Sequence, residues 1–104
     1  MAFPISAGLL DALVLAIVSR EDTYGYKITQ EICDTMKMSE SAFYPVLRRL
    51  QKDECLEAYD KEYMGRNRRY YRLTPKGLSQ LALYREEWIL HKQKVDKIMG
   101  GDNQ

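Results

Sequence analysis

The distinctive chemistry in this sequence is cationic. Residues 63–85 contain no aspartate or glutamate, yet they hold six cations: Arg66, Arg68, Arg69, Arg72, Lys76 and Arg85. The whole chain of 104 residues has a formal net charge of only +1, so the positive charge is local. A cationic patch on a nearly neutral protein favours binding of a polyanion at one face. In its densest part, residues 65–69, we predict that four side chains contact phosphates: Arg66, Asn67, Arg68 and Arg69.

A second set of polar residues follows a helical repeat. Tyr44 and Arg48 are one turn apart, on the face opposite to four apolar residues at i, i+3, i+4 and i+7: Phe43, Val46, Leu47 and Leu50. We predict a phosphate contact for Tyr44 and a base or phosphate contact for Arg48. The alternative is an ordinary solvated helix face.

Three residues near this pair are further candidates for nucleic-acid contacts. Ser41 and Ala42 lie where the helix is expected to begin, and its N-terminal residues are the ones that reach base edges. Arg49 is the third candidate. Its alternative role is an ion pair with a carboxylate close in sequence, either Asp53 or Glu54.

The sequence carries no recognisable catalytic or metal-binding set. His91 is the single histidine and has no cysteine or carboxylate at ligand spacing, and Cys33 and Cys55 fit no metal motif. No Ser–His–Asp set, glycine-rich phosphate loop or pair of buried carboxylates is apparent. We therefore expect a protein that is not an enzyme, without cofactor or metal. The cysteines are predicted to be reduced interior residues, with a redox role as the alternative.

Apolar spacing predicts three helices in the first half of the chain. The first covers residues 6–19 and has Ser6 as its N-cap. Thr23 is expected to cap the second, and Ser39 or Ser41 the third. Three residues at i, i+4 and i+8 would form the inner face of the second helix: Ile28, Ile32 and Met36.

The repeat then changes from helical to alternating. Residues 56–61 and 68–73 alternate, are rich in tyrosine and flank a turn at residues 64–67, so we predict a two-stranded hairpin with a basic tip. Thr74 and Pro75 start a last helix, which Gly100 and Gly101 end. At about 1.5 Å per residue this helix is about 36 Å long.

A helix of that length extends past a three-helix core, so its far half needs a partner. The simplest partner is a second copy of the chain. The apolar residues recur at nearly heptad spacing. We predict that a dimer interface contains five of this helix's residues: Leu81, Tyr84, Trp88, Val95 and Ile98.

Together these elements predict a mostly α-helical protein with a small β-hairpin: a winged helix-turn-helix followed by a long C-terminal dimerisation helix. Residues 1–74 would form the DNA-binding domain and residues 75–104 the dimerisation helix, in one compact unit. The expected partner is double-stranded DNA with a pseudo-palindromic site. No apolar run approaches the roughly 18 residues of a membrane span. Residues 1–4 carry no basic region, so we expect no secretion signal and a cytoplasmic protein.

Four segments, in this order, resemble the PadR family of bacterial transcriptional regulators: residues 10–15 (LDALVL), 24–26 (YGY), 43–50 (FYPVLRRL) and 65–74 (GRNRRYYRLT). The resemblance implies a sequence-specific DNA-binding repressor, often one that a small molecule releases. The single C-terminal helix resembles the compact subgroup that dimerises through it. The alternative is a winged-helix adaptor that binds another protein and has no operator of its own.

Trp88, the single tryptophan, lies at the centre of the last helix's exposed half. In some members of the family a tryptophan at this place stacks flat aromatic molecules between two protomers. Arg85 and Lys92 are on the same helix face as Trp88, and Gly8 and Ala12 on the first helix are small enough to leave space. We therefore predict a cleft for planar aromatic effectors. The alternative is a plain dimer core, with both cations paired to nearby carboxylates.

Overall fold

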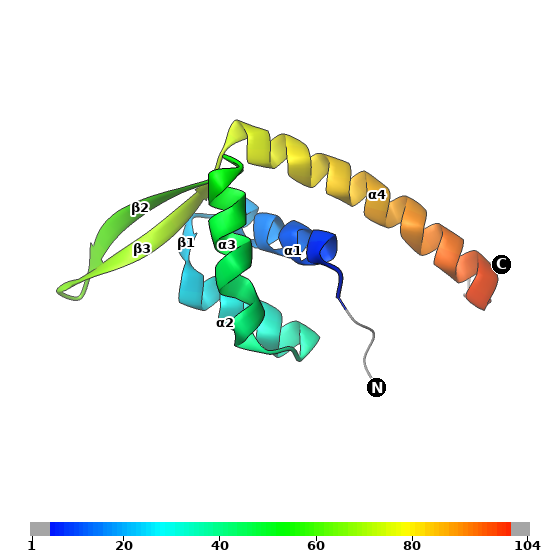
Figure 1. The fold of residues 1–104 in the computed structure, drawn as a ribbon, viewed down its shortest axis with the longest axis horizontal. Helices are drawn as coiled ribbons and strands as arrows, with labels where there is room; N and C mark the ends of the chain where they lie inside the picture. The colour runs from blue at the N-terminus through cyan, green and yellow to red at the C-terminus, as the bar shows by residue number, and fades with distance from the viewer. Residues whose placement is uncertain (1–4, 101–104) are drawn as a thin grey trace.

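The computed structural model describes residues 5–100; Gly101 and the segment 1–4, on which the expectation about a secretion signal rests, lie outside this range. The elements follow one another as α1 (Ala7–Arg20), β1 (Thr23–Tyr24), α2 (Gly25–Met36), the short 3₁₀ helix η1 (Glu40–Ala42), α3 (Phe43–Lys52), β2 (Leu56–Tyr63), β3 (Arg66–Leu73) and α4 (Pro75–Met99). The predicted fold class is confirmed: a mostly helical chain with a winged helix-turn-helix and a long C-terminal helix. The β2–β3 hairpin, hereafter the wing, and α4 project in opposite directions (Figure 1).

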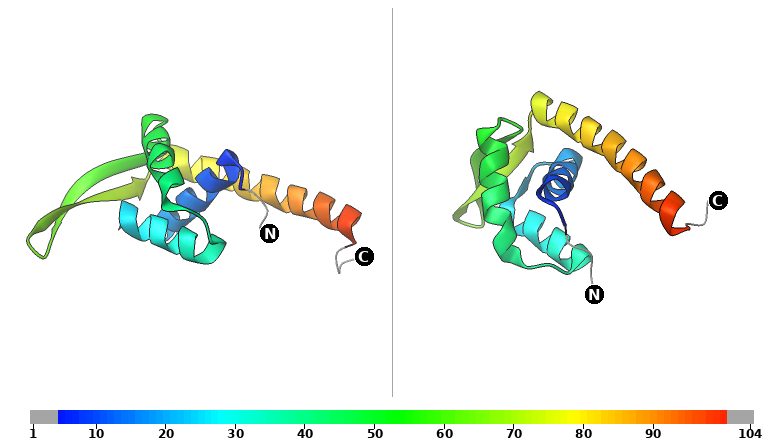
Figure 2. Two further views of the ribbon diagram at one scale, coloured as in Figure 1. Left: turned by 60° about the horizontal axis from the view of Figure 1, so that its bottom comes forward. Right: turned by 45° about the vertical axis from the view of Figure 1, so that its right-hand side comes forward.

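The core forms around α1, which contacts α2, α3, α4 and β3 and lies between the other helices (Figure 2). Val14 and Leu15 of α1 are fully buried, as are Ile28 of α2 and Phe43 of α3. Burial of such apolar side chains is the main force holding the elements together.

Leu81 of α4 also belongs to this core, with only 1% of its side chain exposed. The prediction that Leu81 lies in a dimer interface is therefore wrong. Its helix face meets α1 of the same chain, and nothing of Leu81 remains for a partner.

Several predicted caps are present. Ser6 caps α1 by accepting a hydrogen bond from the Leu9 amide at 3.1 Å, and the third helix is preceded by Ser39, which caps η1. Gly100 ends α4 in a left-handed conformation with φ of 80°. Polar caps and left-handed glycines satisfy the backbone groups that helix ends leave unpaired.

The predicted cap at Thr23 is wrong. Thr23 lies in β1, which pairs with β3 opposite Tyr71, so its side chain is buried on the core side of the sheet. Its hydroxyl has no hydrogen-bond partner within residues 5–100. Tyr24 takes the N-cap position of α2 and makes no side-chain cap hydrogen bond.

The sheet has the strand order β1–β3–β2 and is antiparallel throughout, so the wing gains a short third strand that the sequence did not reveal. The turn of the wing consists of Met64 and Gly65, with φ of 52° and 82°. Two positive φ values are typical of a type I′ turn, whose twist matches that of the strands. The turn is shorter than predicted, and Arg66 and Asn67 belong to β3.

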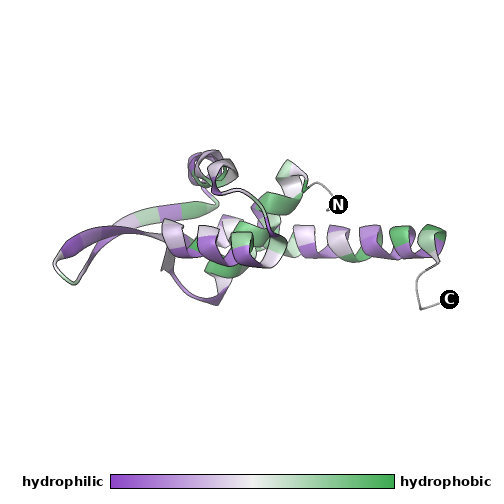
Figure 3. Ribbon diagram, turned by 90° about the horizontal axis from the view of Figure 1, so that it is seen from below, coloured by the Kyte–Doolittle hydropathy of each residue, from purple (hydrophilic) through white to green (hydrophobic). Residues whose placement is uncertain are grey.

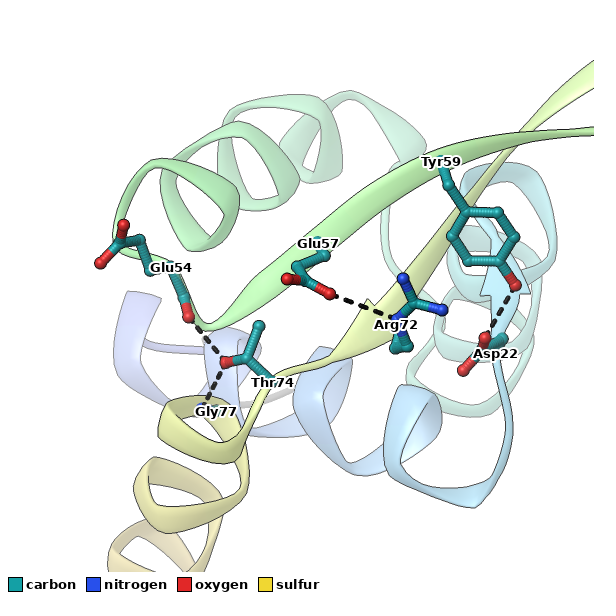
Figure 4. Close-up of polar contacts among 7 residues, drawn as sticks. All are labelled: Asp22, Glu54, Glu57, Tyr59, Arg72, Thr74 and Gly77. Carbon is teal, nitrogen blue, oxygen red and sulfur yellow. Dashed lines mark hydrogen bonds and ion pairs between the residues drawn. The ribbon is translucent and has the colours of Figure 1, made fainter.

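Gly77 allows the wing to join α4 closely. A Cβ atom at this position would lie 2.1 Å from the carbonyl oxygen of Cys55, which precedes β2. The same carbonyl accepts a hydrogen bond from the Thr74 amide at 3.2 Å, and the Thr74 hydroxyl donates to the Glu54 carbonyl at 2.6 Å (Figure 4). Only glycine fits so near a neighbouring backbone.

Candidate nucleic-acid interface

The polar face of α3 is open to solvent. Tyr44 is 68% exposed, and the guanidinium of Arg48 lies 5.5 Å from the centre of its ring. Ser41 is exposed in η1, where its hydroxyl lies 3.0 Å from that of Ser39. Ala42 ends η1, but its side chain lies outside the described part of the structure. Of the two residues predicted at the start of α3, Ser41 therefore lies at the same accessible end as Tyr44.

Arg49 is placed differently from its neighbour Arg48. It forms an ion pair with Asp11 of α1, which is only 8% exposed. The proposed alternative, an ion pair, is the interaction found, but the partner is neither Asp53 nor Glu54. The Arg49 side chain is 42% exposed, but its guanidinium is held against α1, so it is not grouped with Tyr44 and Arg48.

Burial raises the pKa of the Asp11 carboxyl, and the positive charge of Arg49 opposes this rise. A buried carboxylate is stable only with a charged or hydrogen-bonding partner. The guanidinium of Arg49 supplies both the opposite charge and a hydrogen bond. The residue thus anchors α3 to α1.

A hollow separates α3 from the wing. Its lining comes from six residues: Tyr44, Arg48, Gln51, Lys52, Arg69 and Tyr71. Three of these are cations and none is a carboxylate. The hollow therefore brings the predicted helix residues together with one predicted wing residue, Arg69, around a space suited to an anion.

The cations of β3 point to two faces, because side chains alternate along a strand. Asn67 and Arg69 share the face of the buried Tyr71, whereas Arg66 and Arg68 share the opposite face with the half-buried Tyr70. The sequence prediction treated all four polar residues as one group.

The wing is also less purely cationic than its sequence window indicates. The register places Asp60 of β2 opposite Arg69 and Glu62 opposite Asn67. The acid-free window begins only at Tyr63, the last residue of β2, so the carboxylates of β2 lie outside it. Their compensation of the wing cations is visible only once the strands are paired. Within residues 5–100 the ion pairs are Arg20–Glu31, Arg49–Asp11 and Arg72–Glu57, which leaves Arg69 unpaired there.

Arg68 lies between two aromatic rings, a contact that the sequence analysis missed. Its guanidinium is 4.1 Å from the ring centre of Tyr24 and 4.3 Å from that of Tyr63. The sequence does hold a signal for this contact, because tyrosines and cations alternate along the two strands of the wing. Recognising it required the pairing of β1 with β3.

A groove of about 610 Å³ runs between α1 and α4. Three of the residues predicted for the effector cleft line this groove: Gly8, Ala12 and Trp88, the last 49% exposed. Tyr84 also lines this groove. Burial is the main cause that raises the pKa of the Tyr84 hydroxyl, and the negative charge of Asp11 raises it further. The groove is therefore largely apolar with one aromatic wall.

Arg85 and Lys92 do not line this groove. Arg85 borders a separate hollow beside α1 and α2, and the cation in the groove is Lys94. The groove follows the flank of α4 that carries Tyr84 and His91, seven residues apart, rather than the flank of Arg85. The prediction that Arg85 and Lys92 line the ligand cleft is therefore wrong.

The second half of α4 extends away from the other helices (Figure 3). Trp88 and Val95 continue the face that begins with the buried Leu81, yet they are 49% and 37% exposed. Ile98, near the end, is 87% exposed. One apolar stripe is thus covered at its start and open along its remaining length.

The cysteines lie in or beside the interior, as predicted. Cys55 is buried and Cys33 half-buried, and burial is the main cause that raises the pKa of both thiols. Across residues 5–100, no three His, Cys, Asp or Glu side chains are placed to share a metal ion. No helix in the same range is long and apolar enough to cross a membrane.

Comparison with known proteins identifies the family. The model of the transcriptional regulator PadR-like family matches residues 14–83. The crystal structure of smu.1704 from Streptococcus mutans UA159 has 41% sequence identity and a TM-score of 0.89, covering 100% of this chain and 98% of that one. A PadR-like transcriptional regulator from Bacillus cereus, BC4206, has 33% identity and a TM-score of 0.82, covering 91% and 95%. Uncharacterized protein X of Lysinibacillus sphaericus is 36% identical over 93% of this chain and 94% of its own. With about two thirds of its length matched by the family model, the chain belongs to the transcriptional regulator PadR-like family.

Proposed function

We propose that this protein is a sequence-specific regulator that binds double-stranded DNA as a homodimer. The observation that carries the proposal is the hollow in which Arg69 of the wing meets Tyr44 and Arg48 of α3. Its cations suit a DNA backbone passing between helix and wing. Regulators of this family bind DNA, which supports this assignment.

In this proposal α3 enters the major groove and the wing follows the neighbouring backbone. Tyr44 contacts a phosphate, Arg48 a base or phosphate, and Ser41 and Ala42 contact base edges. Arg66, Asn67 and Arg69 neutralise or hydrogen-bond phosphates from the wing. Arg49 holds α3 in place through Asp11.

The occupant proposed for the open stripe of α4 is a second copy of the chain. Trp88 and Val95 are seven residues apart on an exposed apolar stripe, a spacing typical of helices that pack along each other. A symmetric pair would cover both stripes at once. PadR-family regulators are typically dimers.

We further propose that the protein is a repressor, released when a planar aromatic molecule enters the groove between α1 and α4. The support is the exposed ring of Trp88, facing two small residues, Gly8 and Ala12. Titrating a panel of flat aromatic compounds should quench Trp88 fluorescence, and Ala12→Leu, which fills the groove, should abolish the quenching. Equal quenching of the Ala12→Leu variant would place the ligand elsewhere.

The DNA-binding proposal is tested by fluorescence anisotropy with a labelled duplex from the region upstream of its own gene. Replacing Arg48 by Ala should weaken binding by about 10-fold or more, in the range of one lost specific contact. Lys97→Ala, on the last turn of α4 away from the apolar stripe, is the matched loss of a charge and should bind as the wild type does. If no salt-dependent binding occurs at all, the adaptor alternative is favoured.

A further inference from the structure

The outer face of the wing carries a continuous ladder of tyrosines and cations. At its tip end Arg68 lies between the rings of Tyr24 and Tyr63, at 4.1 and 4.3 Å. Tyr63 is the last residue of β2, whereas Tyr24 is the N-cap of α2. One planar guanidinium therefore joins the end of the wing to the start of a core helix.

The ladder continues towards the body of the protein. The ring of Tyr70 stacks on that of Tyr59 with centres 5.8 Å apart and meets Tyr24 edge-on at 5.5 Å. Lys61 lies 5.2 Å from the ring centre of Tyr70. The Tyr59 hydroxyl then donates to Asp22 at 2.7 Å (Figure 4), so the outer face of the hairpin is fixed at its base as well.

The wing needs such support because most of its length is only two strands wide. β1 pairs with β3 only at Tyr70 and Tyr71, so the part from Asp60 to Arg69 has no third strand. A two-stranded hairpin is marginally stable alone in water. Arginine can stack on aromatic rings through both faces of its flat guanidinium, which the compact ammonium of lysine cannot do.

We propose that Arg68 is a positioning residue that fixes the wing against the start of α2, and thereby sets where Arg69 meets the DNA backbone. The effect of Arg68 on wing order concerns the free protein. Its effect on binding rests on the proposed DNA-binding function. Arg69, the adjacent arginine on the opposite face, has no such aromatic contact within residues 5–100 and acts through its charge.

The first test measures amide hydrogen exchange of the free protein. Arg68→Lys keeps the charge but loses the stacking, and it should raise the exchange rate of wing amides about tenfold, as loss of cation–π contacts would. Tyr24→Leu should have the same effect and Tyr24→Phe, which keeps a ring, a much smaller one. Arg69→Lys is the control and should exchange as the wild type does. Wild-type exchange in Arg68→Lys, with the fold intact by circular dichroism, would overturn the proposal.

The second test measures binding to the same upstream duplex at several salt concentrations. Arg68→Lys should weaken binding by a similar factor at every salt concentration, because the number of neutralised phosphates is unchanged. Binding equal to the wild type would show that Arg68 acts only as a charge. If neither protein binds DNA, the proposed function fails, while the exchange experiment still decides whether Arg68 orders the wing.

Discussion

The guanidinium of Arg49 on α3 is ion-paired with Asp11, a buried residue of α1. Asp11 follows Gly8 by one helical turn, and Gly8 lines the groove against α4. The pair thus joins the helix proposed to read DNA to the helix that forms one wall of the groove. If a ligand in the groove moved α1, this ion pair would transmit the movement to α3.

The pH dependence of stability should report on this pair. Burial raises the pKa of Asp11 above its ordinary value of 3.8, so the folded chain binds this proton more tightly than the unfolded chain. The contribution of Asp11 to the free energy of unfolding is therefore greatest below pH 3.8 and falls as the pH rises through the raised folded-state pKa. Urea unfolding of the wild type and Asp11→Asn should show the wild type losing stability relative to the variant over this window. A relative gain would mean that the attraction of Arg49 outweighs the burial of the carboxylate.

Gly77→Ala should destabilise the junction between wing and α4. The added Cβ would lie 2.1 Å from the Cys55 carbonyl oxygen, so the backbone must move. Overpacking of this kind costs about 1–3 kcal/mol in the free energy of unfolding, which urea denaturation can measure. Gly8→Ala is the matched control, since its Cβ would lie 4.0 Å from the Tyr84 ring and meet ordinary contact. Equal effects of the two substitutions would contradict the steric account.

The helices and the wing could be predicted because their signals are local. The apolar face of α3, with Phe43, Val46, Leu47 and Leu50, is buried as its spacing indicated. Ser6 and Thr74 cap α1 and α4 as their positions suggested. Such patterns depend on residues within a few positions of each other, and tertiary contacts reinforce them.

The remaining features depend on residues far apart in sequence. Thr23 looks like a helix cap, but its pairing with Tyr71 places it in a strand. Arg49 could be judged only against nearby carboxylates, whereas its partner Asp11 is 38 residues away. Leu81 fits a heptad stripe, and only the position of α1 shows that this turn of the stripe is already covered. Sequence spacing gives the face of a helix but not the neighbour that covers it.

Dimerisation through α4 predicts a shift to monomer when its stripe becomes charged. Val95→Asp should give a monomer at micromolar concentration in sedimentation velocity, because a carboxylate would be buried without a partner. Leu83→Asp places the same charge on an exposed residue on the far side of α4 and should leave the dimer intact. A wild-type monomer, or equal effects of both variants, would rule out this interface.

In the proposed complex, α3 and the wing hold one DNA backbone between them, and Arg69 neutralises a phosphate. The most direct measurement is the salt dependence of binding to the upstream duplex for the wild type, Arg69→Ala and the control Lys97→Ala. Each neutralised phosphate contributes about 0.9 to the slope of log affinity against log salt, so Arg69→Ala should lower the slope of a dimer by about two. Lys97→Ala should keep the wild-type slope. An unchanged slope and affinity in Arg69→Ala would contradict the proposed interface.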